Sequence, residues 1–232
     1  MNELAYNYIG KGIYSIKEAE RLTQVPSSKI RRWLTGYKYD YKGKSKHTDA
    51  IIGAGFDNTQ DIQTITFADL IEIRFINAFR TYGISWKTIR KAALKAEKIL
   101  SKTHPFSSQR FKTDGRTILL ELIDEQQYRD LIDLANNQCV FEKVIAPYLY
   151  EGLDFNLVDE PERWWPLGKK RSVVIDPQRS FGAPIVTKGG VPTTLIYKAM
   201  LNENSIESVS YWLDIDAAEV VDAVEYEKGL AA

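Results

Sequence analysis

The segment 14–37 constrains the fold more than any other stretch, because its pattern indicates two short helices joined by a tight turn. Ser15 and Glu18 have the capping-box spacing that begins a helix. Pro26 separates the two helices, and Gly36 is placed to end the second. Apolar residues recur at helical spacing in both halves, at Ile16, Ala19, Leu22, Ile30, Trp33 and Leu34. The segment therefore predicts a helix-turn-helix.

The second of these helices is crowded with cations. Lys29, Arg31 and Arg32 fall outside its apolar face, and Ser27 and Ser28 stand at its start, where either could cap it. A helix-turn-helix usually places its second helix in the major groove of DNA. Serine hydroxyls beside cations can also hydrogen-bond phosphate. We expect all five residues to contact DNA, and all except Arg31 are candidates for reading bases.

Alternating tyrosines and lysines in residues 37–46 favour a β-strand with the lysines on the face opposite the tyrosines. Such a strand predicts a wing, whose returning strand we place between Ile62 and Ile65, after a loop over 47–61. We expect the cations to bind phosphate and the tyrosines to combine packing with backbone contact. The candidate DNA-binding residues outside the second helix are Lys17, Tyr37, Lys38, Tyr39, Tyr41, Lys42, Lys44 and Lys46.

Two longer helices follow. Thr66 and Asp69 form a second capping box, Gly83 ends that helix, and Ser85 begins the next. The expected core residues are Phe67, Leu70, Ile71, Phe75, Ile76 and Phe79 in the first helix, and Trp86, Ile89, Ala93, Ala96 and Ile99 or Leu100 in the second. The rest of the second helix is rich in lysine. We interpret it as a solvated face, with supporting phosphate contacts as the alternative.

The remaining sequence divides less sharply. The pattern predicts a hairpin over 111–122, a short helix over 128–134 and a linker over 151–168. A strand over 172–175 precedes three short helices, a spacing typical of a helix-turn-helix-like or homeodomain-like bundle. The predicted fold is mainly α with small β elements, in three segments: 1–102 DNA-binding, 103–169 hairpin and linker, and 170–232 C-terminal bundle.

A net charge of zero hides strong polarity along the chain. Residues 1–48 carry ten Lys and Arg against four Asp and Glu, whereas residues 199–232 carry eight acids against Lys228 alone. Carboxylates on the last helix would repel DNA, so the bundle is expected to dimerise or to bind a protein partner. The candidate partner-binding residues are Trp164, Trp165, Trp212, Glu219 and Asp222. For the two adjacent tryptophans the alternative is packing within their own domain, which is the more common outcome.

Other classes of function find little support. Cys139 is the only cysteine, and His47 and His104 are not at metal-ligand spacing with it, so we expect neither a disulfide nor a metal. No phosphate-cradling glycine loop or nucleophile elbow is present, so we expect no enzyme and no cofactor. No apolar run reaches the length of a membrane span, and the N-terminus lacks a signal-peptide pattern, which predicts a cytoplasmic protein.

Two stretches resemble known families. Residues 14–100 resemble the winged helix-turn-helix of MerR-type regulators, on the segments Tyr14-Ser15-Ile16, Ile30-Arg31-Arg32-Trp33, Thr66-Phe67-Ala68-Asp69-Leu70 and Tyr82-Gly83-Ile84-Ser85. Residues 173–228 resemble an antitoxin-associated domain of unknown function, on the segments Val174-Ile175-Asp176-Pro177, Phe181-Gly182-Ala183-Pro184-Ile185-Val186 and Val191-Pro192-Thr193-Thr194.

The whole arrangement is similar to VapB-type antitoxins with an N-terminal DNA-binding domain. That resemblance implies a repressor of its own operon that binds double-stranded operator DNA and neutralises a PIN-domain ribonuclease toxin. A homodimer is expected, because two half-sites match a two-fold axis. The alternative is a MerR-like transcriptional regulator whose C-terminal part dimerises or senses a small molecule.

Overall fold

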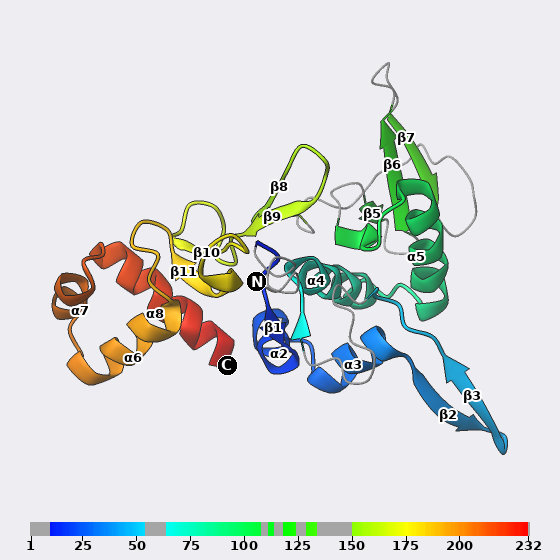
Figure 1. Ribbon diagram of the computed structural model, residues 1–232, viewed down its shortest axis with the longest axis horizontal. Helices are drawn as coiled ribbons and strands as arrows, with labels where there is room; N and C mark the ends of the chain where they lie inside the picture. Colours follow the sequence, from blue (N-terminus) through cyan, green and yellow to red (C-terminus); the bar gives the residue numbers. More distant parts are fainter. Residues whose placement is uncertain are drawn as a thin grey trace, which may run out of the picture. The chain divides into compact units, whose positions relative to one another are not determined.

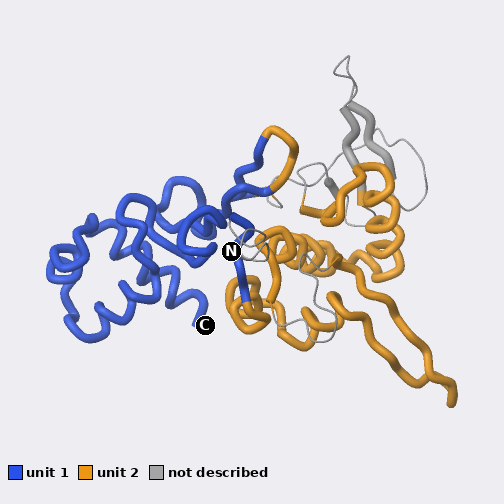
Figure 2. Tube along the Cα trace, viewed as in Figure 1, with its two compact units in different colours: residues 1–14, 151–156, 161–232 blue, residues 15–150, 157–160 orange. Residues whose placement is uncertain are grey.

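In a computed structural model the chain forms two compact units, each described here by itself (Figures 1 and 2). Unit 1 comprises Met1–Tyr14, Glu151–Asn156 and Pro161–Ala232, and unit 2 comprises Ser15–Tyr150 and Leu157–Glu160. The structure describes residues 10–53, 64–107, 111–113, 118–123, 129–133 and 150–231. The sequence predicted 103–169 as a separate segment, but this segment is divided between the two units.

The predicted helix-turn-helix is present in unit 2 as α2 (Ile16–Thr23) and α3 (Ser27–Thr35). Ser15 and Glu18 form the expected capping box, and all six predicted core residues are buried. The expected serine cap of α3 is wrong, because Pro26 occupies the N-cap position without a side-chain hydrogen bond. The carboxylate of Glu20 in α2 instead accepts a hydrogen bond from the backbone N–H of Ser27 at 3.0 Å.

The second helix pair is α4 (Phe67–Thr81) and α5 (Trp86–Leu100). The Thr66–Asp69 capping box forms, and the six apolar residues predicted for α4 are all buried. In α5 the buried residues are Ile89, Ala92 and Ala96, and Ile99 is exposed. The core thus follows the spacing i, i+3, i+7, and the assignments of Ala93 and Ile99 to the core are corrected.

Two carboxylates of α4 are buried beside a histidine. Asp69 and Glu72 are almost completely inaccessible, and Nδ1 of His104 lies 3.4 Å from the first and 3.3 Å from the second. Glu72 also accepts a hydrogen bond from the backbone N–H of Phe106 at 3.1 Å. Burial lowers the pKa of His104, but its hydrogen bond to Glu72 and the two negative charges outweigh this and raise it. Burial raises the pKa of Glu72.

This cluster makes the stability of unit 2 depend on pH. A group whose pKa is raised by folding holds its proton more tightly in the folded state. Its stabilising contribution is complete below the unfolded pKa and is lost as the pH rises through the folded pKa. We therefore expect the free energy of unfolding to fall as the pH is raised above roughly 6.5. Urea unfolding at a series of pH values measures this, and His104→Gln should flatten the slope. Equal slopes in both proteins would contradict the assignment.

The wing is a tight hairpin of β2 (Tyr37–Tyr41) and β3 (Lys44–Thr48), so the returning strand follows two residues after the first. The return expected between Ile62 and Ile65 is therefore wrong. A two-residue strand, β4 (Thr64–Ile65), lies there instead, and another, β1 (Tyr14–Ser15), precedes α2. The sequence pattern misplaced the return because lysines continue at every second position through the turn, at Lys42, Lys44 and Lys46.

The middle of the chain contains a 3₁₀ turn, η1 (Pro105–Ser107), and a three-stranded antiparallel sheet in the order β5-β6-β7. The strands are β5 (Phe111–Thr113), β6 (Ile118–Ile123) and β7 (Arg129–Asp133). The predicted hairpin is confirmed, although its Asp114-Gly115 turn lies outside the described residues. The helix predicted over 128–134 is wrong, because Arg129–Asp133 pairs with β6 and pairing overrides a weak local preference. Cys139 and the apolar stretch 140–149 also lie outside the described residues.

Unit 1 contains a four-stranded antiparallel sheet in the order β11-β10-β9-β8. Its strands are β8 (Leu153–Phe155), β9 (Pro161–Trp164), β10 (Val173–Ile175) and β11 (Pro184–Val186). The strand expected near 172–175 is confirmed. The linker expected over 151–168 is corrected, because β8 and β9 pair there, and Trp164 is opposite both Leu153 and Ile175.

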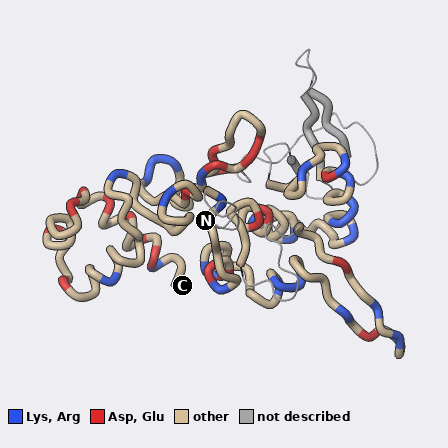
Figure 3. The backbone as a smooth tube through the Cα atoms, viewed as in Figure 1, with Lys and Arg blue, Asp and Glu red and all other residues tan. Residues whose placement is uncertain are grey.

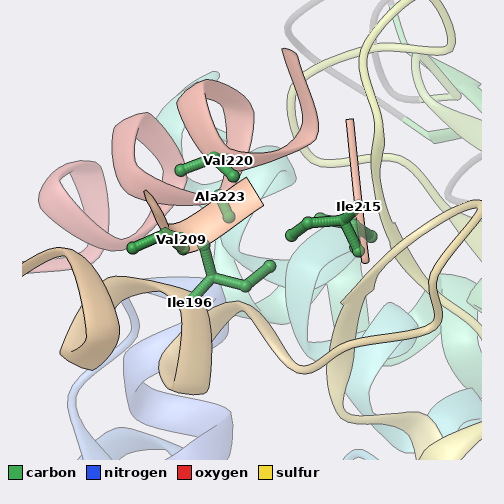
Figure 4. Packing of buried hydrophobic residues seen from close by; sticks show 6 residues of the cluster. Ile196, Val209, Ile215, Val220 and Ala223 are labelled. Carbon is green, nitrogen blue, oxygen red and sulfur yellow. The ribbon is translucent and has the colours of Figure 1, made fainter. Parts of the chain in front are cut away.

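Three helices follow the sheet: α6 (Thr193–Glu203), α7 (Ile206–Leu213) and α8 (Ala217–Ala231). They share a core (Figure 4) made of Val186, Ile196, Val209, Ile215, Val220 and Ala223. Ser205 caps α7 through a hydrogen bond from the backbone N–H of Ser208. Within the described residues, none of the helices is both long enough and apolar enough to cross a bilayer.

Residues 10–14, which precede α2, belong to unit 1. The hydroxyl of Tyr14 donates a hydrogen bond to the carbonyl of Gly182 at 3.0 Å, next to the 3₁₀ turn η3 (Ser180–Gly182). The backbone N–H of Ile13 donates to the carbonyl of Phe181 at the same distance. Tyr14, the aromatic residue that opens the helix-turn-helix pattern, is thus buried and hydrogen-bonded to unit 1.

Candidate nucleic-acid interface

One face of α3 is open to solvent and carries the predicted cations. Ser28, Lys29, Arg31 and Arg32 are exposed, whereas Ser27 is half-buried by its bond to Glu20. The opposite face of α3 is buried against the rest of unit 2. The helix therefore presents its hydroxyl and cationic groups together, as a reader of the major groove must.

Contacts on two sides hold α3 in place. The indole of Trp33 meets that of Trp86, at the start of α5, edge to face with a centroid separation of 5.4 Å. The backbone carbonyl of Trp33 accepts hydrogen bonds from the backbone N–H groups of Ile51 and Ile52, at 2.8 and 3.1 Å. The chain leaving the hairpin is thus tied to the last turn of α3, so helix and hairpin have a defined relation within unit 2.

The hairpin has five paired positions and turns at Lys42 and Gly43, whose φ values are 51° and 69°. Two successive positive φ values match the twist of antiparallel strands, as in a type I′ turn. Tyr39 lies opposite Lys46 and Tyr41 opposite Lys44. Because directly paired residues share a face, the lysines of β3 lie beside the tyrosines. The prediction that these lysines occupy the other face is corrected.

Aromatic–cation contacts connect the side chains on the tyrosine-bearing face of the hairpin. The guanidinium of Arg32 lies 5.4 Å from the ring centre of Tyr37, and the ammonium of Lys46 lies 4.6 Å from that of Tyr41. The Tyr37 and Tyr39 rings are 5.8 Å apart. We call this surface the tyrosine–lysine face, made of Arg32, Tyr37, Tyr39, Tyr41, Lys42, Lys44 and Lys46. The three rings are between 40% and 50% exposed, so they remain available to a ligand.

The tyrosine–lysine face continues the exposed face of α3, because Arg32 belongs to both. Figure 3 shows the Lys and Arg residues on α3 and along both strands of the hairpin. Lys38 pairs with His47 on the other side of the ribbon, and Lys17 is exposed on α2. The structure thus brings together most of the predicted DNA-binding residues and leaves Lys17 and Lys38 apart from them.

Two supporting residues escaped the sequence analysis. Glu20 holds the first N–H of α3, and Arg90 of α5 donates to the carbonyl of Asp49 at 2.7 Å, just after the hairpin. The lysine-rich face of α5 thus contributes at least one contact within unit 2. Glu20 lies seven residues before the group it binds, which is outside the spacing of a capping box, so no local pattern could have identified it.

The carboxylates of α8 do not all form the exposed acidic surface that the sequence predicted. Glu219 and Asp222 are 2% and 8% exposed. Asp222 accepts hydrogen bonds from Arg171 and from the backbone of Ser172, both at 2.6 Å, and Glu219 accepts one from the backbone of Lys188 at 2.8 Å. Burial raises the pKa of Asp222, but these hydrogen bonds outweigh it and leave the pKa below its usual value. Both carboxylates serve the fold, which corrects their assignment to a partner surface.

The three candidate tryptophans have different fates. Trp164 is buried in β9, and the half-buried Trp165 donates its indole N–H to Asp154 at 2.8 Å. Their packing within unit 1 answers the question that the sequence left open. Trp212, the third candidate for partner binding, is 74% exposed. In the part of the chain that the structure describes, no His, Cys, Asp and Glu side chains gather as metal ligands would.

Comparisons with known proteins agree with this site. Residues 12–93, which include α2, α3, the hairpin, α4 and the first half of α5, match the family described as "Putative DNA-binding HTH domain". The chain is 27% identical over 190 residues to "Putative antitoxin VapB45" of Mycobacterium tuberculosis, covering 77% of this chain and 78% of that protein.

The fold also has a counterpart among solved structures. The crystal structure of Rv2018 from Mycobacterium tuberculosis superposes with a TM-score of 0.61 at 20% identity, over 91% of this chain and 96% of that one. At this identity the likeness concerns the fold alone. Residues 12–93 thus form a helix-turn-helix domain, and the chain resembles VapB-type antitoxins that carry such a domain at the N-terminus, as its sequence predicted.

Proposed function

We propose that this protein is an antitoxin that binds the operator of its own operon and neutralises a PIN-domain ribonuclease toxin by direct binding. The observation that carries the DNA-binding part is the continuity of cations from α3 onto the tyrosine–lysine face through Arg32. The antitoxin part rests on the similarity to VapB45. In this proposal the protein is cytoplasmic, represses transcription, and has no enzymatic activity of its own.

In the proposed complex, α3 lies in the major groove and the hairpin follows the phosphate backbone. Ser28, Lys29 and Arg32 stand near the exposed start and middle of the helix, where side chains reach base edges. The lysines of the hairpin neutralise phosphates, and the exposed tyrosines add hydroxyl donors. Two helix pairs flanking a hairpin support the MerR-like subtype, and a homodimer would match two half-sites.

We also propose that α6, α7 and α8 form a helix-turn-helix-like unit that does not read DNA. Its third helix carries Glu225 and buried carboxylates in place of exposed cations. Phosphates would be repelled from such a helix.

A second candidate function is supported by a cavity in unit 1. An apolar pocket of about 390 Å³ lies between α6, α7 and α8, lined by Met200, Ile206, Val220, Val221, Val224, Glu225 and Lys228. Apolar pockets of this size accept small ligands. The alternative is therefore a MerR-like regulator that senses an apolar small molecule there. Ligand-dependent release of DNA would distinguish this regulator from an antitoxin.

Replacing Arg31 or Arg32 with alanine tests the DNA-binding proposal. Each substitution removes one cation from the exposed face of α3, so we expect operator affinity to fall by roughly tenfold, the equivalent of about 1.4 kcal/mol. The dependence of affinity on salt should also become shallower by about one counterion. Mobility-shift assays on the upstream DNA at several salt concentrations measure both quantities.

Lys170→Ala is the matched control, because it removes an exposed cation from unit 1. We expect it to leave the affinity and the salt slope unchanged. If Arg31→Ala and Arg32→Ala behaved like this control, α3 would not be the DNA-reading helix.

A further inference from the structure

The outer surface of α7 exposes two large aromatic side chains. Tyr211 is 87% exposed and Trp212 is 74% exposed, whereas Val209 on the same helix is buried. Aromatic residues bury large areas when they pack, so leaving two neighbouring rings in water forgoes a substantial stabilisation. Tyrosine and tryptophan are also the residues that most often dominate the binding energy of protein interfaces. This surface therefore has the composition of an interface centre.

Acidic groups flank these rings. Glu207 lies four residues before Tyr211, on the same side of the helix, and Asp214 is the residue that directly follows the end of α7. The segment 203–214 contains three acids and no Lys or Arg. Hydrogen bonds from its own backbone N–H and from the Ser205 hydroxyl lower the pKa of Glu207, so this carboxylate stays charged. We call Glu207, Tyr211, Trp212 and Asp214 the α7 patch.

The charge of the α7 patch selects among partners. Nucleic acid is excluded because its phosphates would face these carboxylates. A second copy docked through the same patch would bring identical acids together across the two-fold axis, which like-charge repulsion opposes. A partner with a basic surface meets both the rings and the acids favourably. The acids of α8 cannot supply this complementarity, since Glu219 and Asp222 are buried and bonded within unit 1.

We propose that the α7 patch docks onto a basic surface of the toxin, with Tyr211 and Trp212 as apolar anchors and Glu207 and Asp214 as charge partners. This inference rests on the proposed function. A ribonuclease must present cations to hold RNA phosphates, so such a toxin has a surface of the required charge. The patch would occupy that surface in place of RNA.

The test uses the full chain and the product of the adjacent reading frame, inactivated by replacing one catalytic acid. Calorimetry or interferometry gives the dissociation constant. Trp212→Ala and Tyr211→Ala should each weaken the complex by about 30-fold or more, as anchors of an interface do. Glu207→Lys and Asp214→Asn should slow association and reduce its salt dependence. Asparagine is chosen at 214 because φ is 51° there, a conformation that asparagine tolerates.

Phe181→Ala is the matched control, because Phe181 is 71% exposed in the same unit and lies outside the α7 patch. We expect it to bind within twofold of wild type. If Trp212→Ala and Tyr211→Ala also bind like wild type, the α7 patch is not the docking surface, while the antitoxin function stands. If the unaltered chain does not bind the toxin but still shifts operator DNA, the toxin part of the proposed function fails, and the docking assignment with it. A loss of self-association in Trp212→Ala, measured by light scattering, would instead identify a second copy as the occupant and overturn the proposal.

Discussion

Replacing Trp33 with alanine is expected to lower the free energy of unfolding by roughly 3–5 kcal/mol, the usual cost of truncating a large buried aromatic residue. The indole is 6% exposed and packs edge-on against Trp86. Its loss would leave a cavity between α3 and α5 and remove the contact that orients α3. We therefore expect operator affinity to fall in the same variant, even at temperatures where it is folded. Urea unfolding followed by circular dichroism measures the first effect, and a mobility shift the second.

Two control variants distinguish the effect of this cavity on stability from the effect of losing an indole. Trp33→Phe keeps an aromatic ring facing Trp86 and should cost about 1.5 kcal/mol or less. Trp212→Ala removes an indole that is mostly in water, so it should change stability by less than about 0.5 kcal/mol. If Trp33→Ala were as stable as Trp212→Ala, the anchoring role of Trp33 would be disproved.

The helix-turn-helix was predictable because its determinants are local. Ser15 with Glu18 and Thr66 with Asp69 are each three residues apart, and both pairs form the reciprocal hydrogen bonds that this spacing predicts. The apolar residues of α3 and α4 repeat with the helical period, so their burial follows from the sequence. Most of the DNA-binding candidates are then exposed because they fall between those buried positions.

The errors fall where non-local contacts decide. The lysines of β3 share a face with the tyrosines only because β3 pairs directly with β2, and alternation along a single strand cannot show the register of its partner. Glu219 and Asp222 read as a free acidic face, yet their partners Lys188 and Ser172 lie 31 and 50 residues away. Helical spacing alone would bury Trp212 together with Val209, three residues before it, yet Trp212 is 74% exposed and the shared core takes in Leu213 instead.

Replacing Gly36 with alanine is expected to disrupt the junction between α3 and the hairpin, at a cost of roughly 2–5 kcal/mol. Gly36 has a φ of 72°, which penalises any residue with a Cβ. An added Cβ would also lie 2.3 Å from the carbonyl oxygen of Thr48, on the returning strand of the hairpin. The methyl group cannot be accommodated unless β3 moves away from the end of α3. Since Arg32 and Tyr37 flank this glycine, we expect operator affinity to fall together with stability.

Gly43→Ala is the control variant, because it introduces a Cβ at a positive φ without a contact like the one between Gly36 and Thr48. Gly43 has a φ of 69°, nearly that of Gly36, but an added Cβ there meets no atom within 4 Å. It should therefore show only the backbone penalty, about 1–2 kcal/mol. The excess loss in Gly36→Ala, measured by urea unfolding, then reports the close approach of Thr48 together with the backbone strain at the ψ of −174° that Gly36 adopts. Equal losses in the two variants would mean that the hairpin can shift freely against α3. In that case the tyrosine–lysine face would not be held as a continuation of α3.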